Sequence, residues 1–174
     1  MNALCRTSPE LASAQFKEDL ELIPRGYAER YGWNLKPDFD KLSLYVDMWS
    51  VDERYVRLDD FYVAMDMSYY RTWPPGVTFV NPETRAFEPD TDMRWLPSIK
   101  SKPPGTDIAY HPAYTLNTGE TKQMICNSMC LEYYQSNHSP APEEKWDPGR
   151  HKLFATLNLI QTMLTEPYYG GRAG

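Results

Sequence analysis

The sequence lacks three features that would each define a class of protein. It contains no cluster of lysine and arginine, and its formal net charge is −6, whereas proteins that bind the phosphate backbone usually carry a basic face. No apolar stretch reaches the roughly 20 residues that a membrane span requires. Met1–Cys5 shows no basic segment followed by an apolar run, so we expect no secretory leader. We therefore expect neither nucleic acid nor a membrane as a partner.

Cysteine is also scarce, with three residues in a chain of 174. An odd and small number argues against the disulfide framework of a small secreted domain. Free thiols suit a reducing compartment, where a cysteine can serve as a catalytic nucleophile. We therefore expect a cytoplasmic protein.

The sequence does contain enough apolar residues for a folded core. Hydrophobic residues make up 41% and aromatic residues 14% of the chain, which argues against disorder. There is no internal repeat and no low-complexity segment. A chain of this length suits one core, so we expect a single domain over residues 1–174.

Hydrophobic periodicity predicts an α+β fold. A helix is expected from about Ser8 to Ile23, with Leu11 on its apolar face and Asp19 away from that face. Alternating apolar and polar residues predict an antiparallel β-meander of three strands over Leu42 to Val80. A second amphipathic helix is expected from about His151 to Glu166, packed on the meander.

Four short motifs carry the clearest chemical signal. Met129-Cys130-Leu131-Glu132 is followed at a fixed distance by His138-Ser139-Pro140-Ala141. Upstream lie Trp73-Pro74-Pro75-Gly76-Val77 and then His111-Pro112-Ala113. Each motif is weak alone, but their joint order makes coincidence unlikely. Together they resemble the active-site region of the ubiquitin-conjugating enzymes.

This resemblance implies both a fold and an activity. It implies a domain built from an N-terminal helix, an antiparallel meander and a C-terminal helix. It also implies that a cysteine accepts a ubiquitin-like modifier, or another protein donor, from an activating enzyme as a thioester. The modifier would then pass to an amine on a target protein, and no cofactor or metal is implied. The pattern is most similar to divergent bacterial members found in anti-phage operons, which implies a role in antiviral defence.

The resemblance places the nucleophile at Cys130, with Cys126 as the alternative. Cys126 competes because the gap between His111 and Cys130 is longer than in the family pattern. His138 stands in the place of a large aromatic residue and is a candidate to activate the thiol, while His111 is a candidate for a catalytic or a bracing role. If Cys130 is the nucleophile, it should line a surface groove beside the loop 137–150. If Cys130 is enclosed and Cys126 is open, the assignment moves to Cys126.

A missing asparagine leaves a second function open. Ala113 stands where the family has an asparagine that holds the oxyanion or braces a loop. Asn117, Asn127 or Asn137, or backbone amides, could take its place. The loss also fits a catalytically inactive adaptor of the same fold, which binds a modifier or a partner enzyme.

The two neighbouring cysteines also allow interpretations without acyl transfer. Cys126 and Cys130 with His138 form part of a zinc-ligand pattern, although a structural zinc site needs four ligands. The same two cysteines could instead form a regulatory disulfide.

Overall fold

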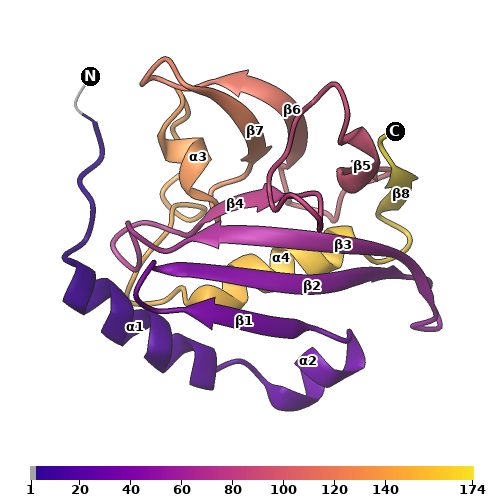
Figure 1. The fold of residues 1–174 in the computed structure, drawn as a ribbon, viewed down its shortest axis with the longest axis horizontal. Helices are drawn as coiled ribbons and strands as arrows, with labels where there is room; N and C mark the ends of the chain where they lie inside the picture. Colours follow the sequence, from indigo (N-terminus) through magenta and orange to yellow (C-terminus); the bar gives the residue numbers. More distant parts are fainter. Residues whose placement is uncertain (1–2) are drawn as a thin grey trace.

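A four-stranded antiparallel sheet forms the centre of the computed structural model, which describes residues 3–174 (Figure 1). The helices are α1 (Pro9–Glu21), α2 (Arg25–Arg30), the 3-10 helix η1 (Met93–Trp95), α3 (Leu131–Tyr134) and α4 (Leu153–Met163). The strands are β1 (Asn34–Asp38), β2 (Ser43–Val51), β3 (Arg57–Asp66), β4 (Gly76–Phe79), β5 (Pro97–Ile99), β6 (Ala109–Thr115), β7 (Thr121–Cys126) and β8 (Tyr169–Arg172). The central sheet has the order β1-β2-β3-β4, while β5 pairs with β8 and β6 pairs with β7. The fold is α+β.

The elements with the strongest periodicity form where the sequence predicts them. α1 begins after Ser8, whose hydroxyl accepts a hydrogen bond from the Leu11 N–H at 3.4 Å. β2, β3 and β4 lie within the expected meander over 42–80, and α4 lies within the expected helix over 151–166. Among the described residues, no helix combines the length and apolar character needed to cross a membrane.

The sheet has one strand more than expected. The additional strand is β1, which the sequence does not predict because it shows no alternation of apolar and polar residues. It is an edge strand whose side chains are mostly exposed, so hydrophobic alternation is weak. Pro37 lies within it, opposite Leu44 of β2. Proline lacks a backbone N–H and is tolerated mainly on edge strands, which is where Pro37 lies.

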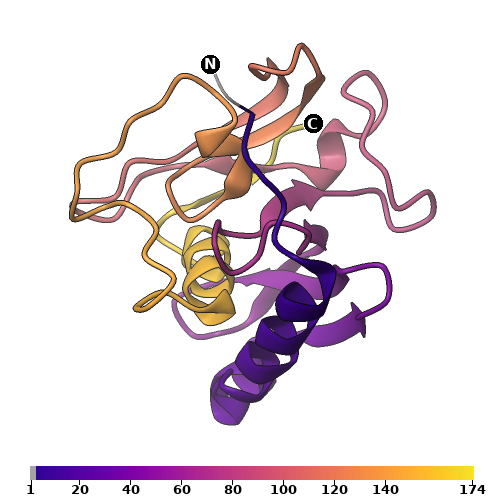
Figure 2. The same cartoon turned by 90° about the vertical axis from the view of Figure 1, so that its left-hand side faces the viewer.

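The main core lies between the sheet and α4, which runs alongside the sheet in Figure 2. Side chains that alternate along the strands meet the apolar face of the helix. The buried set includes Leu44, Val46 and Met48 of β2, Phe61, Val63 and Met65 of β3, and Leu153, Leu157 and Ile160 of α4. The end of α4 is also tied to β2, since the Val51 N–H donates to the Leu164 carbonyl at 3.0 Å.

α1 is held to the rest of the chain by a buried carboxylate, which corrects the expectation that Asp19 faces away from the core. Asp19 is fully buried, and Leu11 is half exposed instead. The Asp19 carboxylate accepts the Tyr70 hydroxyl and two N–H groups of Arg71, at 3.0 Å and 2.9 Å. A buried charge with these partners remains satisfied, which explains its place in the core.

Asp19→Ala should therefore strongly destabilise the protein. The substitution leaves the guanidinium of Arg71, whose side chain is only 11% exposed, without its buried counter-charge. We expect the free energy of unfolding in urea to fall by about 3–5 kcal/mol. Glu18→Ala is the matched control, because Glu18 also pairs with Arg71 but its side chain is 63% exposed. It should cost less than about 1 kcal/mol, and equal losses for the two variants would contradict this account.

Candidate functional site

The hairpin of β6 and β7 is fixed to the outer edge of β4 by side chains. The amide of Gln123 accepts the Phe79 N–H at 2.7 Å and donates to the Phe79 carbonyl at 2.9 Å. The carboxylate of Glu132 accepts the Val77 N–H, with both oxygens at 3.3 Å. Glu132 also pairs with the Lys122 ammonium of β7 at 3.3 Å. These bonds place β7 and the start of α3 beside the sheet.

Cys130 belongs to the core, contrary to the expectation that it lines a surface groove. It is fully buried at the start of α3. The next residue, Leu131, donates its N–H to the Pro75 carbonyl at 3.0 Å, so this segment docks on the double proline. Burial raises the pKa of the Cys130 thiol, and the negative charge of Glu132 raises it further. A large acyl donor cannot reach this sulfur, so the assignment moves to Cys126.

Cys126 is the last residue of β7, is partly exposed and contacts a histidine. Its Sγ lies 3.4 Å from Nε2 of His138, and Nδ1 of His138 lies 2.6 Å from the Ser136 hydroxyl. Ser136 donates its own proton to the Tyr133 carbonyl at 2.9 Å. The Ser136 oxygen therefore accepts a hydrogen bond from Nδ1–H, which leaves the lone pair of Nε2 free to accept the thiol proton. These hydrogen bonds link Cys126, His138 and Ser136 in the order of a nucleophile, a base and a group that orients the base.

The surroundings of Cys126 make this base necessary for reactivity. Burial raises the pKa of the Cys126 thiol, and the negative charge of Asp107 raises it further, while Lys102 acts in the opposite direction. The thiol is therefore protonated at neutral pH, and only the thiolate is an effective nucleophile. Nε2 of His138, 3.4 Å from Sγ, is in position to accept that proton.

His111 is separated from His138 by the ring of Tyr114. Its ring packs against that of Tyr114 with centroids 5.3 Å apart, and Tyr114 lies 6.4 Å from the ring of His138. Pro112 and Ala113 follow at a bulge, because the ladder register shifts between His111 and Tyr114. The His-Pro-Ala segment therefore shapes the hairpin, and proline is common at such bulges.

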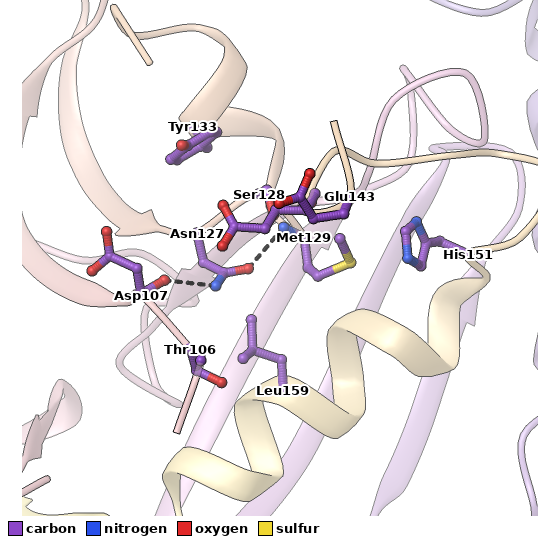
Figure 3. Close-up of a pocket in the computed structure, with 11 residues that line it drawn as sticks. Thr106, Asp107, Asn127, Ser128, Met129, Tyr133, Glu143, His151 and Leu159 are labelled. Atoms are coloured by element: carbon purple, nitrogen blue, oxygen red, sulfur yellow. Dashed lines mark hydrogen bonds between the residues drawn. The ribbon is translucent and has the colours of Figure 1, made fainter. Parts of the chain in front are cut away.

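A cavity of about 240 Å³ lies beside the candidate nucleophile (Figure 3). It is lined by the residue after Cys126 and by Tyr133, whose ring lies 4.7 Å from that of His138. Three acidic residues also line it, namely Asp107, Glu143 and Glu144. In Figure 3, Asp107, Tyr133 and Glu143 come from separate segments of the chain. The cavity therefore gathers acidic residues next to the turn that follows Cys126.

Asn127 braces the turn that follows Cys126, which is one function expected of a replacement for the missing asparagine. Its Nδ2 donates to the Asp107 carbonyl at 2.8 Å, and its Oδ1 accepts the Met129 N–H at 2.8 Å (Figure 3). These bonds hold the turn against the segment before β6. Asn117 lies in the turn of the hairpin, and Asn137 lies in the loop after α3.

The described part of the chain does not form the zinc site or the disulfide considered from the sequence. All three cysteines are free thiols. Within residues 3–174, no three side chains among His, Cys, Asp and Glu are grouped closely enough to share a metal ion. Cys126 faces His138 and Cys130 faces the core, which separates the expected ligands.

No protein-family model matches the chain, and no curated protein matches its sequence significantly. Sequence reasoning did name both members of the contact between Cys126 and His138. It missed Ser136, although a serine two residues before a histidine is close enough for a local hydrogen bond.

The three thiols should differ in their reactivity with iodoacetamide. In the folded protein, Cys5 and Cys126 should be alkylated, while the buried Cys130 should react only after unfolding. Because the pKa of Cys126 is raised, its thiolate fraction and its alkylation rate should still be increasing above pH 9. Peptide mass spectrometry over a pH series checks both statements. Alkylation of native Cys130 at a rate similar to that of Cys126 would contradict the burial described above.

Proposed function

We propose that the protein is a thiol acyltransferase of the ubiquitin-conjugating type. It takes a ubiquitin-like modifier from an activating enzyme onto Cys126 as a thioester and passes it to a target protein. The observation that carries the proposal is the hydrogen-bonded chain of Cys126, His138 and Ser136 at an accessible position. A thiol with its own base can exchange acyl groups with another thioester.

The order of elements supports this proposal. A helix precedes an antiparallel meander, a double proline leads into β4, a His-Pro hairpin carries the cysteine, and a long helix follows. This is the order that the resemblance implies for ubiquitin-conjugating enzymes. The proposal includes the setting implied by the same resemblance, a bacterial conjugation system that acts against phage.

The loading step requires only groups that are present at the site. Nε2 of His138 takes the proton from the Cys126 thiol as Sγ attacks the carbonyl carbon of the incoming thioester. A tetrahedral intermediate forms, and its carbon–sulfur bond to the activating enzyme then breaks. The departing thiolate takes the proton from Nε2, so the acyl group remains on Cys126 and charge is conserved.

A non-catalytic adaptor of the same fold is the second candidate. Two observations favour it, namely the alanine at position 113 and the burial of Cys130, the cysteine that best fits the family motif. An adaptor would bind a modifier or an activating enzyme but would never carry the modifier covalently. Covalent loading therefore separates the two candidates.

Loading of Cys126 can be tested with the cognate activating enzyme and modifier, together with ATP. The parent protein should gain an adduct of the size of the modifier, and a reducing thiol should remove it. Cys126→Ser should show a thiol-resistant ester or no adduct, and the matched control Cys5→Ser should load as the parent does. His138→Ala should slow loading by roughly 10²-fold or more, the scale of general-base catalysis.

Gel shift and intact mass measure the loading of each variant. Two results would overturn the statements above. If Cys126→Ser loads like the parent through a thioester, the nucleophile is misassigned. If neither Cys126 nor Cys130 is ever loaded by enzymes that load another acceptor, the protein is an adaptor.

A further inference from the structure

We propose that the acceptor in the second step is a hydroxyl group, a serine or threonine side chain of the target, and that His138 activates it. The product is then an oxygen ester of the modifier rather than an amide. This inference rests on the proposed function, because it concerns the fate of the acyl group on Cys126. It departs from the amine acceptor that the sequence resemblance implies.

The base remains in place after loading. Once Sγ of Cys126 carries an acyl group, it has no proton to donate, and Nε2 of His138 loses its donor. The Ser136 oxygen still accepts a hydrogen bond from Nδ1–H at 2.6 Å, and its hydroxyl still donates to the Tyr133 carbonyl. His138 therefore keeps its orientation and its free lone pair. Because Nε2 lies 3.4 Å from Sγ, that lone pair faces the neighbourhood of the acyl carbon.

A base in this position matters far more for a hydroxyl than for an amine. A neutral amine is a good nucleophile and attacks a thioester without assistance. A hydroxyl is a poor nucleophile until its proton is removed during the attack, which is the task of histidine in serine-type acyl transfer. An oriented imidazole beside the thioester therefore extends the reaction to alcohols.

The charges around the cavity act against a lysine acceptor. Asp107, Glu143 and Glu144 line the cavity next to Asn127, the residue after Cys126, and all three residues are exposed. Lys102 pairs with Asp107 at 3.5 Å and offsets part of this negative charge. Nearby negative charge favours the protonated form of an amine, which has no lone pair for attack. The effect of exposed carboxylates is moderated by solvent, but its direction is fixed. A hydroxyl has no charge to stabilise and keeps its lone pairs at every physiological pH.

The transfer balances without any additional reactant. The hydroxyl oxygen attacks the carbonyl carbon of the thioester while Nε2 of His138 takes the hydroxyl proton. The tetrahedral intermediate collapses with cleavage of the carbon–sulfur bond, and the Cys126 thiolate recovers the proton from Nε2. One thioester and one alcohol become one ester and one thiol.

A small thioester allows this step to be measured without the activating enzyme. The probe is the mercaptoethanesulfonate thioester of acetyl-glycyl-glycine, loaded onto a Cys5→Ser background so that only Cys126 is available on the surface. The loaded protein is separated from the probe and divided between N-acetyl-threonine methylamide and Nα-acetyl-lysine methylamide. Intact mass spectrometry follows the acyl protein, and hydroxylamine distinguishes the ester, which it cleaves, from the amide.

We expect ester formation on threonine that depends on His138. With both proteins loaded to the same extent, His138→Gln should lower transfer to threonine by roughly 10²-fold and should lower the threonine-to-lysine ratio. The lysine reaction of the same preparation is the internal control for folding. Ser136→Ala, which removes only the positioning hydroxyl, should lower the threonine-to-lysine ratio in the same direction.

The possible failures are distinguishable. If Cys126 loads but only lysine is acylated, or if loss of His138 leaves the threonine-to-lysine ratio unchanged, the hydroxyl acceptor is wrong and the proposed function stands. Release to water without any threonine ester also overturns the hydroxyl acceptor. If the probe never acylates Cys126 while it acylates free cysteine in the same solution, the nucleophile itself is wrong and both proposals fall.

Discussion

The open edge of β4 is the constraint on which the candidate site depends. β4 is the last strand of the central sheet, and buried backbone groups at such an edge need partners. At Val77 and Phe79 these partners are the side chains of Glu132 and Gln123 instead of another strand. The two side chains lie on either side of Cys126 in the sequence. Satisfying the sheet edge therefore also fixes the position of the candidate nucleophile.

The parts of the fold that could be predicted are those in which one local signal dominates. The serine cap and apolar face of α1 and the alternation of β2 and β3 are such signals. β1 was missed because Pro37 interrupts a strand that buries little, and the β6–β7 hairpin was missed because its bulge at Pro112 breaks the alternation. Asp19 was placed on the wrong face because its partner, Arg71, is distant in the sequence.

The candidate site could be predicted in its residue types but not in its assembly. Cys126 and His138 were both named, yet the motif pointed to Cys130, since a sequence does not show which of two nearby thiols is buried. Leu131 and Glu132, which follow Cys130, bind the segment to Pro75 and Val77 at the sheet edge. This structural role accounts for the motif around Cys130 although Cys130 itself is buried. The role of Ser136 in orienting the imidazole of His138 becomes visible only when the hydrogen-bond donors and acceptors around that ring are known.

The way in which the sheet edges are covered also limits how other chains can associate with this protein. Free ladder groups on an edge strand are templates for strand addition and for aggregation. At one edge, β1 is short and is interrupted by Pro37, which has no N–H to offer. At the other edge, Gln123 occupies both ladder groups of Phe79. Partners that approach the sheet at these positions therefore meet side chains instead of free ladder groups, and specificity there can change by substitution without any change in the backbone.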